Sequence, residues 1–269
     1  MLLTDARLQE FRRRGYLRLG KLLGDEELRA LRVRIDEIML GTAPVPYDRM
    51  LMQLDPGTSP PQRRRGASTG HKGATLAYRK IQDLELEPLF RSYLQRPLFA
   101  ELCRRIYGEG RAISTFRAMF INKPAGAGTD LRWHQDRWVD LDRDPQITVW
   151  TALDPASTAN GCMQIVPGSH RRLRNARDGS GFLSGEQRAE LERLILAGDP
   201  KHCPMHLELE AGEAVLLHNW TLHRSGTNAA AIPRRAFSVC YMDAATRSHR
   251  GQLFPLIFDP DGRAIPAAA

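Results

Sequence analysis

Apolar residues in the first third of the chain recur at the three- and four-residue spacing of amphipathic helices. This pattern predicts helices over Thr4–Gly15, from Asp25 onward, and over Glu87–Tyr107. Thr4 and Asp25 are residue types that cap helix N-termini, and Pro97 is expected to begin a new helix within the third segment. The apolar face of the second helix consists of Leu28, Leu31, Ile35 and Ile38. Each helix is therefore expected to pack through one face.

From Ser114 onward the apolar pattern changes to short alternating runs, which are typical of strands. The expected strands are Ser114–Asn122, Gln146–Leu153, Cys162–Val166, His206–Glu210, Glu213–His218 and Arg235–Met242. An earlier short strand, Tyr16–Leu19, separates the first two helices. Several strands at such spacing point to a sandwich or a closed double sheet. We therefore expect a mainly β protein with its helical N-terminal third packed outside the sheets.

The length of 269 residues suits a single β domain with added helices. We expect a mainly helical part over 1–113, a β core over 114–243 and a C-terminal segment over 244–269. Proline, glycine and the run Arg63–Arg65 make Gly41–Thr75 a long loop, either a functional lid or a surface excursion. Ser169–Cys203, with a helix from Ser184 to Ala197, is interpreted as an insertion near the mouth of the sheets.

Composition narrows the class of protein. Hydrophobic residues at 42% and charged residues at 26% indicate a soluble globular chain. The net charge of +8 could steer an anionic substrate, but no nucleic-acid-binding motif accompanies it, and arginine-rich composition is also a common genomic bias. The four cysteines form no C-x-x-C pair, which argues against a disulfide scaffold or a structural zinc site. Without a long apolar run we expect a cytoplasmic protein that does not enter a membrane.

The stretch Arg132–Trp138 holds the strongest candidate for chemistry. On an extended backbone, His134 and Asp136 can turn toward one metal ion, and an open iron site needs one further histidine. His218 and His223 compete for that place, and their separation of five puts them on opposite faces of a continuous strand. At most one of them is therefore expected to be a ligand. The similar run His206–Glu208 alternates with inward leucines and is interpreted as a solvent face.

Several short motifs follow one another in an order that is characteristic of one enzyme family. They are Gly15-Tyr16, Lys80-Ile81-Gln82-Asp83, Met119-Phe120-Ile121-Asn122-Lys123-Pro124, His134-Gln135-Asp136, Trp150-Thr151-Ala152-Leu153, Asn160-Gly161, Pro167-Gly168-Ser169-His170, His223-Arg224-Ser225-Gly226-Thr227-Asn228 and Arg234-Arg235. In this set the chain resembles the phytanoyl-CoA dioxygenase (PhyH) family of iron(II)/2-oxoglutarate oxygenases. The resemblance spans almost the whole chain.

The resemblance implies roles for individual residues. It assigns the metal to His134, Asp136 and His223, and so selects His223 over His218. It makes Arg234 the partner of the distal carboxylate of 2-oxoglutarate, and a guanidinium can bind a carboxylate through two parallel hydrogen bonds. Arg235 should point to the opposite face of the strand and lie exposed. The residues implied to line the co-substrate site are Ser225, Trp150, Met119 and Lys80.

The resemblance also implies a fold and a reaction. The fold is a double-stranded β-helix, a cupin-like jelly roll. The enzyme would use iron(II), 2-oxoglutarate and O2 to hydroxylate a C–H bond of a small molecule, with succinate and CO2 as co-products. Asp136 stands where halogenating relatives carry a small residue, which favours hydroxylation over halogenation. Desaturation, epoxidation or cyclisation by the same residues is an alternative, and a non-catalytic jelly-roll binding protein is a second.

The residues that flank the metal motif are candidates for substrate contact. Trp133, Arg137 and Trp138 adjoin His134 and Asp136 in the sequence. An arginine-rich rim would favour an anionic substrate such as a carboxylate, a phosphonate or an acyl thioester.

Overall fold

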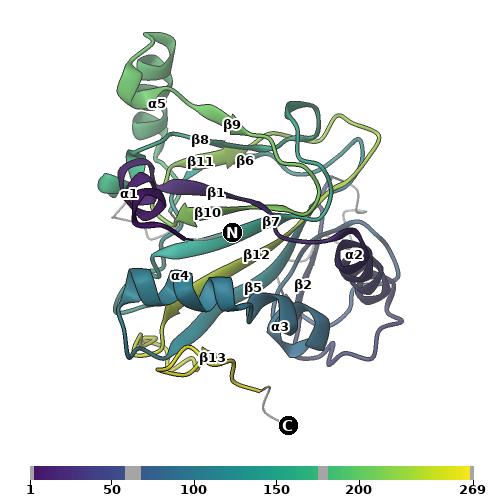
Figure 1. Cartoon of the computed structure of the whole chain (residues 1–269). Helices are drawn as coiled ribbons and strands as arrows, with labels where there is room; N and C mark the ends of the chain where they lie inside the picture. The colour runs from purple at the N-terminus through teal and green to yellow at the C-terminus, as the bar shows by residue number, and fades with distance from the viewer. Residues whose placement is uncertain (1–2, 58–67, 175–180, 267–269) are drawn as a thin grey trace.

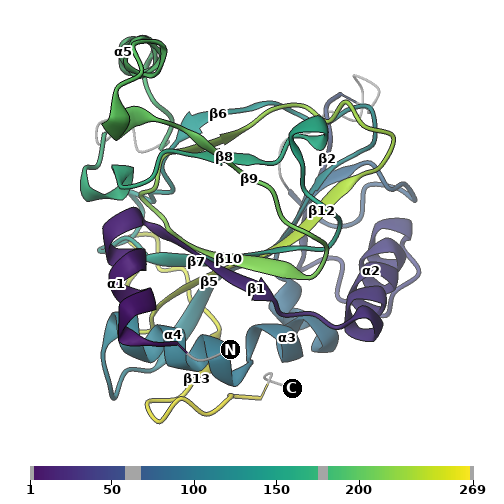
Figure 2. The ribbon, with the colours of Figure 1, turned by 45° about the horizontal axis from the view of Figure 1, so that its top comes forward.

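The computed structural model describes residues 3–57, 68–174 and 181–266, and in these residues two antiparallel sheets face each other (Figure 1, Figure 2). The order of the large sheet is β1 (Tyr16–Lys21), β10 (Glu213–His218), β7 (Ile147–Ala152), β12 (Arg234–Asp243), β5 (Ile113–Lys123), β4 (Tyr78–Ile81), β2 (Leu51–Leu54) and β3 (Ser68–Thr69), with β13 (Leu256–Phe258) also paired to β5. The order of the small sheet is β6 (Leu131–His134), β11 (His223–Ser225), β8 (Met163–Ile165) and β9 (Met205–Leu207). The predicted jelly-roll architecture is confirmed, although the sheets do not close into a barrel.

Helices cover the outer face of the large sheet. α2 (Asp25–Leu40), α3 (Pro88–Leu94) and α4 (Pro97–Tyr107) lie on that side in both views. Leu31, Ile35 and Ile38 of α2 are fully buried there, as their helical spacing predicted. A second apolar cluster, which includes Trp150, Ile165 and Leu217, fills part of the space between the two sheets.

The predicted N-terminal cap is confirmed for the first helix and wrong for the second. α1 (Asp5–Arg14) is capped by Thr4, whose hydroxyl accepts a hydrogen bond from the Arg7 N–H at 3.4 Å. The cap of α2 is Gly24, so the prediction that Asp25 caps this helix is wrong. Asp25 is the first residue inside α2, and its carboxylate lies 2.9 Å from the Lys21 ammonium group. A negative charge in the first turn also interacts favourably with the positive end of the helix dipole.

The prediction of a continuous loop over 41–75 is wrong. β2 and β3 lie within this segment, and β2 pairs with β4 at the far edge of the large sheet. Met52 and Leu54 are buried on alternate positions of β2, but the run is too short to stand out among the surrounding prolines and glycines. The mainly helical part therefore also supplies strands to the sheet. The run Arg63–Arg65 lies outside the described residues.

The insertion and the expected strand ends lie close to their predicted places. α5 (Gly185–Leu196) is capped by Ser184, and it packs through Leu191 against the outer face of the small sheet. β9 ends at Leu207, so the predicted strand to Glu210 is too long, although Leu209 still forms an isolated bridge with Ala156. His206 and Glu208 are exposed and the two leucines are buried, which confirms the interpretation of this run as a solvent face.

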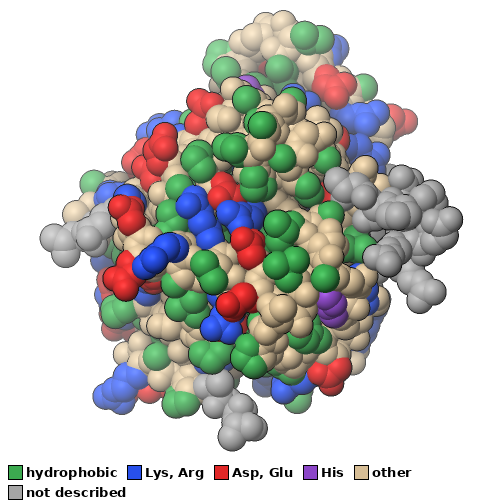
Figure 3. Space-filling view, turned by 90° about the vertical axis from the view of Figure 1, so that its right-hand side faces the viewer, with side chains coloured by type: hydrophobic (Ala, Val, Ile, Leu, Met, Phe, Trp, Pro, Cys, Tyr) green, Lys and Arg blue, Asp and Glu red, His purple; other side chains and the backbone are tan. Residues whose placement is uncertain are grey.

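Surface charge is mixed on the face that α2 occupies, where basic and acidic side chains lie side by side (Figure 3). Among the described residues, no helix combines the length and the apolar content that a bilayer-spanning helix needs.

Candidate metal and co-substrate site

Two neighbouring strands of the small sheet bring together the three predicted metal ligands. His134 ends β6 and His223 begins β11, and the two residues face each other in the antiparallel register. Asp136 follows two residues later, held by a 2.7 Å hydrogen bond from its N–H to the Asn219 carbonyl. The Asp136 carboxylate lies 3.9 Å from Nε2 of His134 and 4.0 Å from Nε2 of His223. One ligand atom from each of the three side chains lies within 4.8 Å of the others.

Backbone hydrogen bonds fix which nitrogen of each histidine faces the site. Nδ1 of His134 donates to the Arg132 carbonyl at 2.8 Å, and Nδ1 of His223 donates to the Thr221 carbonyl at 2.9 Å. A carbonyl can only accept, so each Nδ1 carries a proton, and Nε2 is the nitrogen that each ring turns toward the site. Burial lowers the pKa of His134 to about 4, so its ring is neutral at neutral pH. Two imidazoles and a carboxylate fit a divalent metal with open positions, and the set suits iron(II).

The competing histidine, His218, contacts other residues than the metal triad. Its ring packs 4.9 Å from the ring of His170, and its Nδ1 accepts the Trp220 N–H at 3.1 Å. Burial lowers its pKa to about 4 as well. His218 lines the same cavity as the triad, but the group of three possible ligand atoms includes His223 and not His218.

The middle residue of the metal motif, Gln135, was not singled out from the sequence. Its buried amide donates to the carbonyls of Arg172 at 2.9 Å and Trp220 at 2.6 Å, and accepts the Arg174 N–H at 2.8 Å. Its own N–H donates to the Gly181 carbonyl at 2.9 Å, and a Cβ at Gly181 would lie 2.1 Å from the Gln135 carbonyl oxygen. Gln135 thus joins the metal-bearing strand to the insertion and to the turn before His223.

We expect Gln135→Leu to lower the free energy of unfolding by about 2 kcal/mol, because three hydrogen bonds are lost at a buried site where water cannot replace them. Chemical denaturation of the two proteins measures this difference. Gln164→Leu on β8 is the matched control, since its amide is partly exposed and water can replace its bonds. Equal losses in the two variants would contradict a special positioning role for Gln135.

Arg234 is the second unusual feature of the site. Its side chain is buried, its guanidinium carbon lies 5.5 Å from the centre of the Trp150 ring, and its Nε has no hydrogen-bond partner. No carboxylate of the described residues pairs with this guanidinium. Burial lowers its pKa to about 10, so it remains a cation at neutral pH. An unpaired buried cation is unfavourable unless a ligand brings the opposite charge, so Arg234 fits an anionic ligand such as a carboxylate.

The adjacent Arg235 points to the opposite face of β12, as predicted. Its guanidinium binds Asp154 through two hydrogen bonds of 2.7 and 3.0 Å and reaches Asp36 of α2 at 2.7 Å. The prediction that Arg235 is exposed is wrong, because these contacts leave its side chain only 15% exposed. Arg235 fastens α2 to the sheet and leaves Arg234 as the cation that enters the cavity.

A cavity of about 440 Å³ between the two sheets connects these groups. Its lining includes the triad, Arg234 and the other residues assigned to the co-substrate site by resemblance, which are Lys80, Met119, Trp150 and Ser225. Arg137 and Trp138 also line it. Trp133 does not: its side chain is buried on the other face of the small sheet, against Leu191 of α5. The structure therefore does not bring Trp133 to the place where a substrate would bind.

The family comparison agrees with this geometry. The sequence model of the phytanoyl-CoA dioxygenase family (PhyH) matches residues 11–236 of this chain. The chain belongs to this family. The match confirms the resemblance seen in the sequence motifs and, with it, the prediction of an enzyme of the dioxygenase class.

The sequence identity to individual relatives and solved structures is low. Phytanoyl-CoA dioxygenase domain-containing protein 1 of Danio rerio is 28% identical over 278 residues, which cover 90% of this chain and 91% of that protein. The structure of EctD from S. alaskensis with 2-oxoglutarate and 5-hydroxyectoine has a TM-score of 0.70 at 18% identity and covers 91% of this chain and 78% of that one. SnoK, a non-heme alpha ketoglutarate dependent carbocyclase, has a TM-score of 0.69 at 19% identity over 94% and 96% of the two chains. These structures share the fold.

Proposed function

We propose that this protein is an iron(II)- and 2-oxoglutarate-dependent dioxygenase that hydroxylates a small molecule. In the balanced reaction, substrate R–H, 2-oxoglutarate and O2 give R–OH, succinate and CO2. One oxygen atom enters the product and the other enters succinate. The observation that carries the proposal is the buried Arg234, which pairs with no carboxylate of the described residues and lies in the same cavity as two histidines and a carboxylate.

The residues of the chain have separate tasks in this reaction. His134, Asp136 and His223 would hold iron(II) on one face, which leaves the remaining positions for the co-substrate and O2. Arg234 would bind the far carboxylate of 2-oxoglutarate, and the ring of Trp150 keeps water from that ion pair. When bound, iron and 2-oxoglutarate together supply the oxidising chemistry. The protein supplies geometry, burial and charge.

Asp136 bears on the outcome of the reaction. Because its carboxylate stands beside both histidines, it occupies the place that a halide would need, and this supports hydroxylation over halogenation. Desaturation or ring closure uses the same ligands, and the position of the substrate above the metal decides among them. Mass spectrometry separates these outcomes, since hydroxylation adds one oxygen and desaturation removes two hydrogens.

The direct test of the function is turnover of 2-oxoglutarate under labelled O2. The purified protein with iron(II) should convert 2-oxoglutarate to succinate that carries one labelled oxygen atom, slowly alone and faster with a substrate. His134→Ala should remove this activity. Succinate without label, or no succinate with any compound, would contradict the proposal and favour a non-catalytic binding protein.

A further inference from the structure

A second cation faces the cavity without a partner at the end away from Arg234. Arg117 of β5 lines the cavity, and among the described residues its side chain has neither a hydrogen bond nor an ion pair. Its guanidinium carbon lies 4.7 Å from the ring centre of Phe116 and 5.3 Å from that of Trp138. Stacking on two rings holds the guanidinium in place while its N–H groups stay available to a ligand.

The strand register places the backbones of Arg117 and Arg234 far apart along β5 and β12. Arg234 pairs with Lys123, and Arg117 lies six residues before Lys123 on β5. At about 3.4 Å per residue, the backbones at the two arginines are roughly 20 Å apart. A five-carbon 2-oxoglutarate with its oxo acid end at the triad and its far carboxylate at Arg234 leaves Arg117 unused.

The cavity lining is strongly basic, which also favours an anionic ligand. The described residues that line it include seven cations and a single carboxylate, that of Asp136. The cations are Arg79, Lys80, Arg117, Lys123, Arg137, Arg224 and Arg234. Burial and the charge of Arg117 lower the pKa of Lys80 to about 8, so a second cationic side chain adjoins Arg117. No carboxylate lies within ion-pair distance of either side chain in the described part of the chain.

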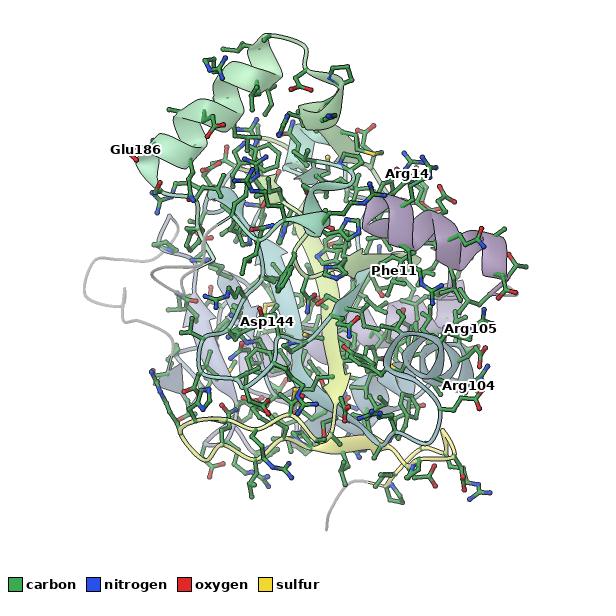
Figure 4. The ribbon with its side chains drawn as sticks, turned by 90° about the vertical axis from the view of Figure 1, so that its left-hand side faces the viewer. Phe11, Arg14, Arg104, Arg105, Asp144 and Glu186 are labelled. Carbon is green, nitrogen blue, oxygen red and sulfur yellow. The ribbon has the colours of Figure 1, made fainter. Side chains whose placement is uncertain are left out.

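Another basic residue that lines the cavity, Arg137, already has a carboxylate partner. Its Nε lies 3.7 Å from the Asp144 carboxylate. Asp144, labelled near the middle of Figure 4, also accepts the backbone N–H of Trp138 and the indole N–H of Trp220, each at 3.0 Å. Asp144 therefore holds the Trp138 backbone, whose ring stacks with Arg117, and it balances the charge of Arg137. The Arg117 guanidinium keeps its N–H groups available to a ligand.

We propose that Arg117 is the specificity-determining residue for the main substrate and that this substrate carries an oxyanion, a carboxylate or a phosphonate, which binds the Arg117 guanidinium. The inference rests on the proposed function. It adds that the oxidised carbon belongs to an anion held between Arg117 and the metal, against the ring of Trp138, which lines the cavity. A substrate with a flat or apolar body next to its anionic group fits this wall.

Three probes of similar shape test the proposal: benzoate, phenylphosphonate and the neutral benzamide. Their binding to the protein loaded with iron(II) and saturating 2-oxoglutarate is measured by anaerobic calorimetry, so that the Arg234 end is already filled. We expect at least one anion to bind ten times more tightly than benzamide. Arg117→Met should remove this preference, and whichever anion binds more tightly identifies the oxyanion.

Two controls separate the outcomes. Arg143→Met removes an equal charge from an exposed position in the same loop as Asp144 and should keep the preference. The 2-oxoglutarate affinity of Arg117→Met should match the wild type, which shows an intact site. No anion preference in the wild type, including no binding of any probe, overturns the proposal, as does a preference that survives in Arg117→Met. A wild type that does not bind 2-oxoglutarate would contradict the proposed function, and this result is distinct from the absence of an anion preference.

Discussion

Arg234→Met is expected to raise the dissociation constant for 2-oxoglutarate by about 100-fold, which corresponds to about 3 kcal/mol for a buried carboxylate that loses its charged partner. Arg234→Lys should recover only part of this affinity, because an ammonium group cannot form the two parallel bonds of a guanidinium. Titration of 2-oxoglutarate into the anaerobic iron(II) protein measures both. An affinity in Arg234→Met within threefold of the wild type would contradict the assignment.

In the absence of ligand, Arg234→Met should not lower the thermal stability of the protein. Because Arg234 is a buried cation without a partner, replacing it with methionine removes an unfavourable charge, and the thermal midpoint of the ligand-free protein should equal or exceed that of the wild type. The rise in midpoint that 2-oxoglutarate gives the wild type should be absent. Arg235→Met is the matched control: it breaks the contacts to Asp154 and Asp36, so it should lower the midpoint and leave 2-oxoglutarate affinity unchanged.

His223→Ala is expected to abolish iron(II) binding at micromolar metal, while His218→Ala retains it. The two histidines lie five residues apart, line the same cavity and differ in whether their Nε2 faces Asp136. Removal of one of three ligands leaves too few donors to hold the ion, whereas His218 lies beside His170 and donates nothing to the triad. Metal analysis after anaerobic gel filtration measures the bound iron.

The comparison can fail in two ways. Equal iron in His223→Ala and the wild type would exclude His223 as a ligand. Loss of iron in His218→Ala without loss of folding would place His218 in the metal site. Circular dichroism of both variants shows whether they remain folded.

The sequence predicted the chemistry of the site better than its geometry. The spacing of His134 and Asp136 is a local property, so an extended backbone was enough to pair them. The choice between His218 and His223 depends on which strand pairs with β6, and strand pairing is not local; the family motif supplied that choice, and the register of His223 opposite His134 explains it. The exposure of Trp133 likewise depends on α5, which covers the outer face of the small sheet.

Arg117 shows what periodicity could still have found. Met119 was assigned to the cavity from the family motif, and side chains two residues apart on a strand share a face. Arg117, Ile121 and Lys123 therefore had to face the cavity with Met119, and they do. No local pattern could have shown that Arg117 is unpaired, because its candidate partners come from distant segments of the chain.

The most direct test of the central claim is the visible spectrum of the anaerobic protein with iron(II) and 2-oxoglutarate. Iron(II) held by His134, Asp136 and His223 would give a weak metal-to-ligand charge-transfer band when the oxo acid binds it. We predict this band in the wild type and its absence in His134→Ala and in His223→Ala. A wild type without the band, or a band that survives in both variants, would contradict the assignment of this site.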